Sequence, residues 1–419
     1  MLRLVVLGVL IFVGADCHEM LLSFESAREI PEERLGLACP IELDYSPQCI
    51  CDFWSYDIFN IYCNASSPEE LNVITQTFER TPIVEHFEVK ISLTASMSIP
   101  ANVFSNKTAV SIILECIGDE TKLGLIDPQA FIKTTAKTSA FQITYCDLTD
   151  FDFAFLAQLR ILETLRLSNT TLTTMARMPL MPHMRTIELF APTGLRHWHD
   201  PAQTPYLETI TINAAADTDQ DTMEKIVETL VYYDSSLLRL YLVNLGLTRI
   251  PPAVRNLSRL NTLDLTQNLI STLPNGSLAL SSALSSLWLP YMPLQNIEAG
   301  AFRGNFRVSL IYMVFNKLTT FPREVYEDIL EEMLIGSGSF NIYGNPMTCD
   351  DCHLGWLINE KRYLLTRVSD GMCANGTSFD QLDSQVYGAR CVKDNAAAPN
   401  KAPPLLLILI LTVIGFLLV

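Results

Sequence analysis

The chain is short of positive charge. It has 29 Lys and Arg residues against 46 Asp and Glu residues, so its formal net charge is −17 at pH 7. Proteins that bind nucleic acid need a basic face to meet the phosphates, so this balance argues against a nucleic-acid partner. An acidic surface instead keeps a protein soluble and favours a partner with a basic patch.

Motifs for catalysis are also missing. The sequence has no Gly-rich phosphate loop, no Gly-x-Ser-x-Gly elbow and no His-Glu-x-x-His. A single local cluster, His197-Trp198-His199-Asp200, has no distant ligand or nucleophile to converge with, so we predict a surface loop there. We therefore expect a protein that is not an enzyme and that needs neither a metal nor a cofactor.

No hydrophobic segment reaches the ~20 residues that a membrane-spanning helix needs. The apolar run 4–13 follows Arg3 and precedes the small residues Gly14 and Ala15. This pattern predicts a signal peptide over residues 1–17, cleaved after either Ala15 or Cys17. Of the 11 cysteines, cleavage after Cys17 leaves an even number that can all pair, whereas cleavage after Ala15 leaves one thiol spare.

A second apolar run, 405–419, ends the sequence and follows a polar, proline-rich segment, 394–404. Small residues, a spacer and a short hydrophobic tail are typical of a GPI-attachment signal. We predict that the lipid is attached at Asn395, with Ala396 as the alternative, on the outer face of the plasma membrane. A single-pass membrane anchor and a secreted protein are the alternatives.

Sequons for N-glycosylation occur along the whole interior. Each is weak alone, but several behind a signal peptide fit a glycosylated extracellular protein. They lie at Asn64, Asn106, Asn169, Asn256, Asn275 and Asn375.

The interior repeats the frame L-x-x-L-x-L-x-x-N-x-L. The clearest copies are LNTLDLTQNLI at 260–270 and VSLIYMVFNKL at 308–318. Most copies are spaced by 22 to 24 residues. The last apolar residues of the L-x-L cores are Val89, Ile113, Ile143, Leu167, Leu189, Ile212, Leu242, Leu265, Leu289, Met313 and Ile335.

In a strand, alternate side chains point to opposite faces, so L-x-L places two residues in a core and one in solvent. One repeat cannot bury its apolar face alone, but stacked repeats can. The sequence therefore predicts an α/β solenoid: a leucine-rich-repeat horseshoe with a parallel concave sheet and about 11 repeats. The Asn at the ninth frame position is expected to bond the backbone of neighbouring turns.

After Cys17, four cysteines precede the repeats and four follow them. The first cluster contains a Cys-x-Cys pair and the second contains a Cys-x2-Cys pair. Spacing alone leaves three pairings open for each set of four, and a Cys-x2-Cys pair can also bind zinc, although an oxidising compartment favours disulfides. The clusters are Cys39, Cys49, Cys51 and Cys63 before the repeats, and Cys349, Cys352, Cys373 and Cys391 after them.

These clusters resemble the capping modules of extracellular leucine-rich-repeat proteins. The resemblance implies an N-terminal cap at 36–68, repeats at 69–343 and a C-terminal cap at 344–393. It also implies the disulfides Cys39–Cys51, Cys49–Cys63, Cys349–Cys373 and Cys352–Cys391.

Two further cysteines, Cys116 and Cys146, occupy the Asn slot of adjacent repeats. Adjacent strands lie about 4.8 Å apart, which is within disulfide range. The sequence does not decide between a disulfide bridge and a pair of buried thiols.

An acidic segment precedes the copy at Leu242. The spacing Asp217-x-Asp219-x-Asp221 is similar to a calcium loop, but Thr222 stands where such loops require Gly. We instead predict an acidic loop in which Asp221 or Thr222 caps a short helix.

The central exposed position of each strand defines the expected concave face. Its members are Glu88, Ile112, Gln142, Arg166, Glu188, Thr211, Tyr241, Asp264, Trp288, Tyr312 and Leu334. Aromatic and Arg side chains are enriched at binding hot spots. We therefore predict a protein-binding site formed by Arg239, Tyr241, Asp264, Trp288 and Tyr312. Cross-strand packing that stiffens the sheet is the alternative.

The early CxC module, the loose first repeats and the phrase LNTLDL look like arthropod members of this superfamily. They resemble the non-catalytic leucine-rich subunits of crustacean luciferase complexes and the chaoptin- and connectin-like surface proteins. The first resemblance implies a scaffold subunit of a secreted enzyme complex. The second implies a cell-surface protein that acts in adhesion or ligand recognition, with an extracellular protein as its partner.

Overall fold

The computed structural model describes residues 47–388, except 56–57, 81–84, 105–107, 119–120, 132–136, 176–177, 351 and 386. The predicted signal peptide, Asn106, the 394–404 segment with Asn395 and the 405–419 tail lie outside the described residues. Among the described residues, no helix has the length and hydrophobicity to cross a bilayer.

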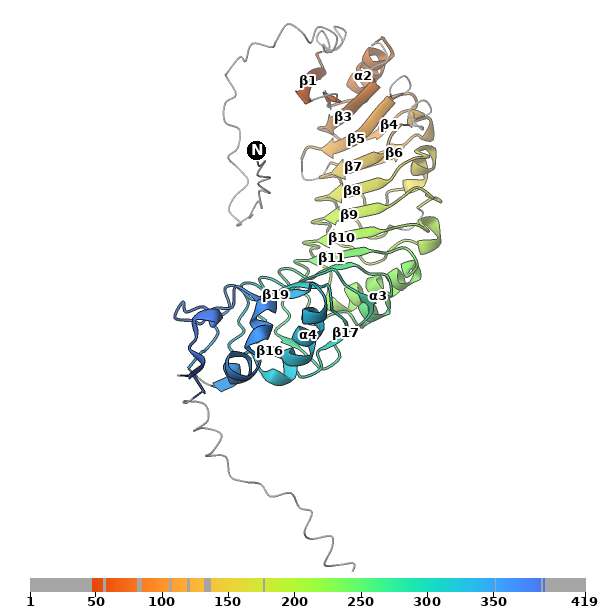
Figure 1. Ribbon diagram of the computed structural model, residues 1–419. Helices are drawn as coiled ribbons and strands as arrows, with labels where there is room; N and C mark the ends of the chain where they lie inside the picture. Colours follow the sequence, from red (N-terminus) through yellow and green to blue (C-terminus); the bar gives the residue numbers. More distant parts are fainter. Residues whose placement is uncertain are drawn as a thin grey trace, which may run out of the picture. The chain divides into compact units, whose positions relative to one another are not determined.

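One large sheet organises the described chain, and its strands follow one another in sequence order (Figure 1). β1 pairs antiparallel with β2, and every later pair in this sheet is parallel. The strands are β1 (Cys49–Ser55), β2 (Ile58–Ala65), β3 (Glu85–Leu93), β5 (Thr108–Cys116), β7 (Ala140–Thr144), β8 (Thr164–Ser168), β9 (Thr186–Phe190), β10 (Thr209–Asn213), β11 (Arg239–Val243), β12 (Thr262–Asp264), β15 (Ser286–Trp288), β18 (Leu310–Tyr312), β19 (Ser339–Asn341) and β20 (Val368–Ser369).

The chain between these strands returns through short, varied segments. Within the described ranges, the α-helices are α2 (Pro68–Arg80), α3 (Gln220–Leu230) and α4 (Arg323–Ile335). Three small parallel pairs are β4 (Met97–Ile99) with β6 (Leu123–Ile126), β13 (Thr272–Leu273) with β16 (Asn296–Ile297), and β14 (Leu278–Ala283) with β17 (Phe302–Asn305). The 3₁₀-helices are η2 (Pro128–Phe131), η3 (Phe153–Gln158), η4 (Pro201–Gln203), η5 (Val231–Tyr233), η6 (Pro252–Asn256), η7 (Cys352–Leu354), η9 (Arg362–Arg367) and η10 (Phe379–Gln381), and η8 (Trp356–Glu360) is a π-helix.

The alternation predicted from L-x-L is present in the strands. Leu240 and Leu242 of β11 are fully buried, whereas Tyr241 between them is only half-buried on the open face of the sheet. Leu240 pairs with Leu263 of β12, so equivalent apolar residues of successive turns stack in one core. This arrangement, with one parallel strand per turn, is the predicted leucine-rich-repeat solenoid.

The asparagine ladder joins successive turns. The Asn268 side chain is buried; its Nδ2 donates to the carbonyls of Leu242 (2.7 Å) and Leu265 (2.8 Å). Its Oδ1 accepts from the backbone N–H groups of Leu245 and Leu247, both at 3.1 Å. Asn316 and Asn345 bond neighbouring turns in the same way. The predicted role of the ninth frame position is therefore confirmed, because this buried amide has partners on both atoms.

A second ladder follows the ends of the strands. There, non-glycine residues adopt positive φ angles, and the backbone N–H of each donates to a carbonyl in the next turn. The left-handed region is costly for side chains with a Cβ, and only Asn and Asp enter it readily. These rim positions, the eighth of the frame, are Tyr145, Asn169, Ala191, Ala214, Asn244, Gln267, Tyr291 and Phe315.

Three of the predicted repeat anchors are wrong. Ile335 lies at the end of helix α4, and the next strand is β19, with Phe340 buried at its centre. In β5 Ile112 and Leu114 are buried whereas Ile113 between them is only half-buried, so the strand is shifted by one residue from the predicted anchor Ile113. Ile91 of β3 pairs with Leu114, which shifts the first anchor from Val89 by two residues.

Three disulfides are present in full. Cys49–Cys63 joins β1 to β2, and Cys349–Cys373 lies after the repeats, as the resemblance implied. Cys116–Cys146 joins adjacent turns, which answers the question left open between a bridge and two thiols. Cys51 and Cys352 are also disulfide-bonded, but their predicted partners Cys39 and Cys391 lie outside the described residues. Those two pairings stay predictions.

Helix α3 begins differently from the prediction. Asp219 is the N-cap, and its Oδ1 accepts from the Thr222 N–H at 2.7 Å, so neither Asp221 nor Thr222 caps the helix. Met223, Ile226 and Leu230 fall on one buried face because their spacing matches the helical period. The acidic segment thus starts a helix of the return path.

The His197–Asp200 segment is not wholly a surface loop, which corrects the prediction. His197 is exposed, but Trp198 and His199 are buried beneath the return segments. His199 Nε2 lies 2.8 Å from Thr204 Oγ1 and 3.0 Å from the Tyr233 hydroxyl. Burial lowers the pKa of His199 to about 4, so the imidazole is neutral in the fold.

Candidate functional site

Four of the five predicted site residues lie in one row across the open face of the main sheet. Tyr241 of β11 pairs with Asp264 of β12, Asp264 with Trp288 of β15, and Trp288 with Tyr312 of β18. The row is continuous because every pairing is parallel and in register. The fifth residue, Arg239, lies two residues before Tyr241 on the same face, and its Nε donates to Thr209 Oγ1 at 2.9 Å.

Trp288 and Tyr312 stack on each other. Their ring centroids are 3.9 Å apart and the ring planes differ by 14°. Both side chains are half-buried, so each ring has a face against its neighbour and an edge in solvent. Such a pair is stiff and amphipathic, and it loses little conformational entropy when a partner covers it.

Asp264 is a carboxylate held among these rings. Its Oδ1 accepts from the Thr266 N–H at 2.8 Å and from the Thr266 hydroxyl. Burial raises the pKa of Asp264, and these hydrogen bonds only partly oppose that effect. Burial also raises the pKa of the Tyr241 hydroxyl, whereas Arg239 acts in the opposite direction. The row therefore combines one desolvated acid with large aromatic surfaces.

Three more aromatic residues, which the sequence reasoning missed, extend this row toward the rim. Tyr291 and Phe315 stack with centroids 5.1 Å apart and planes 12° apart. Tyr343 meets Phe315 edge-on at 5.3 Å. All three are nearly half exposed, at 45–47%. We call Trp288, Tyr291, Tyr312, Phe315 and Tyr343 the aromatic surface.

Two members of the aromatic surface are held in an unfavourable backbone conformation. The φ angles of Tyr291 and Phe315 are 56° and 53°. The left-handed region costs a residue with a Cβ about 1–2 kcal/mol, and bulky residues seldom occupy it. A Cβ at Gly344 would overlap the Phe315 ring, so the ring packs directly on that glycine. The same left-handed conformation recurs at the other rim positions, so it belongs to the repeat, and what distinguishes these two turns is that large aromatic rings occupy it.

The other half of the open face is built differently. Arg166 of β8 forms an ion pair with Glu188 of β9, with Nη2 and Oε2 2.6 Å apart, and its guanidinium also lies over the Phe190 ring at 5.3 Å. Gln142 pairs with Arg166 and Thr211 pairs with Glu188, so both continue this row. Here the charged groups already have partners within the sheet.

Three members of the predicted concave row are wrong. Ile112 is fully buried, and Ile113 takes the exposed position opposite Gln142. Leu334 belongs to helix α4, and Asn341 pairs with Tyr312. In β3 the residue that belongs to the row is Lys90, because it pairs with Ile113. Glu88 lies two residues before it. None of these three was among the five predicted site residues.

Among the described residues, no group of three or more His, Cys, Asp or Glu side chains could hold a metal ion. The described sequons Asn64, Asn169, Asn256, Asn275 and Asn375 are all exposed. They stay predicted glycosylation sites.

The parallel sheet, the asparagine ladder and the disulfides together define a leucine-rich-repeat solenoid of a kind suited to an extracellular setting, since disulfides persist in oxidising compartments. No protein-family model matches the chain. The chain is similar to the Oplophorus-luciferin 2-monooxygenase non-catalytic subunit of Oplophorus gracilirostris, with 24% identity over 92% of this chain and 96% of the relative. This supports the resemblance to luciferase subunits, and the relative's name agrees with the expectation of a protein without catalysis.

Among solved structures, the chain is similar to one from the Toll–Spatzle complex of Drosophila. The TM-score is 0.45, with 15% identity over 74% of this chain and 46% of that one. It is also similar to a chain of the mouse RP105/MD-1 complex, with a TM-score of 0.45 and 14% identity over 77% of this chain and 62% of that one. The chain spans less than two thirds of either structure, and likenesses with TM-scores this low do not bear on function.

Proposed function

We propose that this protein is a non-enzymatic extracellular binding protein whose aromatic surface, with Arg239, Tyr241 and Asp264, contacts a protein partner. The aromatic surface carries the proposal. Its rings are exposed or half-buried, most of them stack on one another, and they occupy consecutive turns of a rigid sheet. Rigid aromatic anchors of this kind dominate the binding energy of many protein interfaces.

The charge of the chain supports a basic partner. The net charge is −17, and Asp264 lies in the middle of the row. Lys or Arg side chains of a partner can pair with such a carboxylate and pack on neighbouring rings.

A double substitution tests the proposal. Partners are first captured from surface-labelled cells with the wild-type protein, and the affinity of one captured partner is then measured. We expect Trp288→Ala with Tyr312→Ala to weaken binding by about 30-fold or more, because hot-spot truncations cost at least ~2 kcal/mol. The ion pair between Arg166 and Glu188 offers a matched control on the same face of the sheet.

For that control, Arg166→Ala with Glu188→Ala should leave the affinity within about fivefold, because the two side chains lie outside the proposed site and a surface ion pair contributes at most ~1 kcal/mol. Unchanged binding by the aromatic double variant, with its thermal unfolding and circular dichroism intact, would refute the proposed site. Equal losses in both variants would show that the whole face, and not the aromatic surface, binds.

A second candidate function is that of a scaffold subunit. The similarity to a non-catalytic subunit extends over 92% of this chain, and this favours it. In that case the protein would be secreted in a stable complex with an enzyme, and the same aromatic surface would serve as the subunit interface. Size-exclusion chromatography of conditioned medium, followed by mass spectrometry, separates the two: a co-eluting enzyme supports the scaffold, and elution alone opposes it.

We further propose that the chain is anchored to the outer face of the membrane by a lipid at Asn395. The pattern of 394–404 followed by 405–419 supports this assignment.

A further inference from the structure

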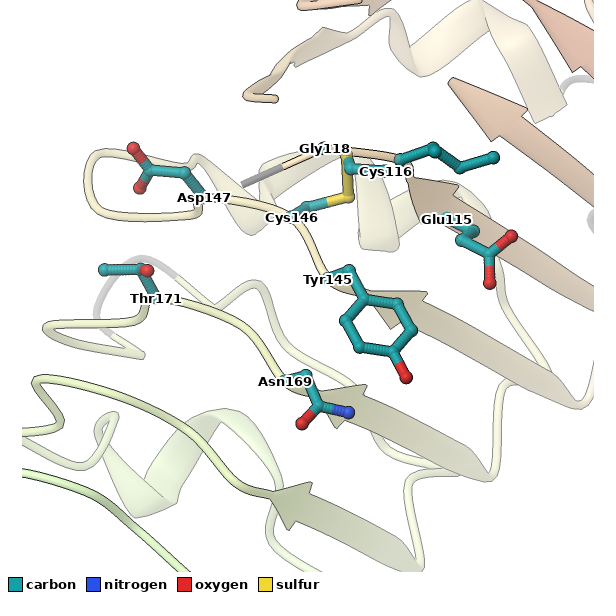
Figure 2. Close-up of a pocket in the computed structure, with 9 residues that line it drawn as sticks. Glu115, Cys116, Gly118, Tyr145, Cys146, Asp147, Asn169 and Thr171 are labelled. Carbon is teal, nitrogen blue, oxygen red and sulfur yellow. A yellow bond between two sulfur atoms is a disulfide. The ribbon is translucent and has the colours of Figure 1, made fainter. Parts of the chain in front are cut away.

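Asn169 lines a pocket at the rim of the main sheet, next to the Cys116–Cys146 disulfide (Figure 2). Its volume is about 410 Å³, within the ~300–1,000 Å³ range of small-ligand sites. Tyr145 lies beside Asn169, because the strands are in register at Thr144 and Ser168 and the Tyr145 N–H donates to the Ser168 carbonyl. Asn169 and the Tyr145 ring thus belong to one wall.

The remaining walls fit a neutral ligand with hydroxyl groups. Ile117 and Tyr145 give the pocket an apolar side, with exposures of 47% and 55%. The carboxylates of Glu115 and Asp147 line it too, but each already has a lysine partner at 2.9 Å. A free metal cation or an anion therefore gains little here. Carboxylate oxygens can still accept hydrogen bonds from hydroxyl groups.

Asn169 itself can supply such a ligand. Asn169-Thr170-Thr171 is a sequon, and Asn169 is exposed with φ 51°. No described residue bonds its side-chain amide, whereas the amide of Asn275, another sequon, donates to the Ala299 carbonyl at 2.9 Å. The Asn169 amide is thus available at the edge of a cavity that suits a sugar.

We propose that Asn169 carries an N-linked glycan whose first N-acetylglucosamine packs in this pocket against the Tyr145 ring. Attachment replaces one Nδ2 hydrogen by C1 of the sugar, taken from a lipid-linked oligosaccharide whose diphosphate leaves as the proton is released. A sugar hydroxyl donates to the carboxylate of Glu115, which lies on the same side of the disulfide as Tyr145, and the apolar face of the sugar ring covers Tyr145. Covalent tethering gives the sugar a high local concentration, so weak contacts suffice to hold it.

The test follows the release of glycans from the folded, full-length protein made in animal cells. Peptide N-glycosidase is added under native conditions, and site-resolved mass spectrometry follows Asn169 and, as an internal reference, Asn256. Asn256 is an exposed sequon on the return path, outside this pocket. We expect the Asn169 glycan to be released about threefold to tenfold more slowly, from the ~0.5–1.5 kcal/mol of a ring contact.

Two variants link this protection to the pocket. Tyr145→Ala should bring the Asn169 rate to that of Asn256, and Tyr145→Phe should leave it slow. Alanine fits the backbone here, because Ala191 and Ala214 occupy equivalent rim positions with φ 46° and 53°. An unoccupied Asn169, equal release rates in the wild type, or unchanged protection in Tyr145→Ala would each overturn the proposal. None of these results depends on the proposed partner site.

Discussion

At the scale of single residues, His199 links stability to pH. Its imidazole is buried and neutral, and its Nδ1 has no hydrogen-bond partner among the described residues. Protonation would therefore place an unpaired charge in the core. The pKa is about 4 in the fold against 6.5 for a free histidine. Because the folded pKa is the lower one, the unfolded chain binds more protons between these values.

We expect the free energy of unfolding to fall by about 2 kcal/mol from pH 7 to pH 5 through this residue. The contribution of the neutral His199 to stability is present above pH 6.5 and is lost as the pH falls toward 4. Chemical denaturation at both pH values measures the effect. His199→Gln serves as the control: it should be less stable at pH 7 but lose less on acidification. An equal loss in wild type and variant would assign the effect to other groups.

Asn268 offers a second prediction at this scale. Asn268→Ala removes the side chain that bonds Leu242, Leu245, Leu247 and Leu265, and leaves buried backbone groups without partners. We expect a loss of about 4 kcal/mol in the free energy of unfolding. Gln267→Ala, at the exposed neighbouring position, should change it by less than about 1 kcal/mol. Similar losses in the two variants would show that the ladder bonds contribute little.

At the scale of elements, the Cys116–Cys146 disulfide joins the last residue of β5 to the segment that follows β7, across 30 residues of chain. Cross-linking a segment of this length stabilises a fold by about 3.6 kcal/mol, chiefly by restricting the unfolded chain. We expect Cys116→Ala with Cys146→Ala to lower the free energy of unfolding by that amount, as measured by urea denaturation.

Wild type and variant are also compared after reduction, as a control for the packing that the two substitutions remove. With all disulfides reduced, wild type and variant should differ only by the small cavities that the substitutions leave. If the oxidised proteins differ no more than the reduced ones, the cross-link does not stabilise the fold.

How much could be predicted also depends on the element. Between 260 and 270 the apolar residues alternate cleanly, so frame, strand and asparagine role all follow from the sequence. In β5 the run Ile112, Ile113, Leu114 does not alternate, and period two cannot fix its register. Met333-Leu334-Ile335 imitates L-x-L, although Ile329, Leu330 and Met333 are buried with helical spacing.

The candidate site was predictable only in part. The row from Tyr241 to Tyr312 follows from the frame, because each member is the central residue of a clear L-x-L. Tyr291 and Phe315 are visible in the sequence at the eighth frame position. Their exposure and their stacking depend on a left-handed backbone, which contacts with the neighbouring turns impose. The aromatic residues themselves give no local sign of that backbone conformation.

At the scale of the whole molecule, the proposed lipid anchor predicts where the protein is found. Treatment of intact expressing cells with phosphatidylinositol-specific phospholipase C should release most of the surface protein into the medium, as measured by immunoblot. The reason is that a GPI-linked protein is held by its lipid alone. A transmembrane-anchored reporter should remain on the cells.

Replacing the small residues near the attachment point offers a matched variant. Asn395→Gln with Ala396→Leu should reduce the phospholipase-sensitive surface pool, because transfer requires small residues there. Protein that stays on treated cells would point to a membrane-spanning tail. Protein found in the medium without treatment would favour the scaffold function.

The bridge between Cys116 and Cys146 also bears on how the protein survives among extracellular proteases. Every peptide bond between these two residues lies inside a covalent ring. A cut there leaves both fragments joined, with the turns on either side still held by their strands. Such a nicked molecule would run as one band on a non-reducing gel and as two under reduction.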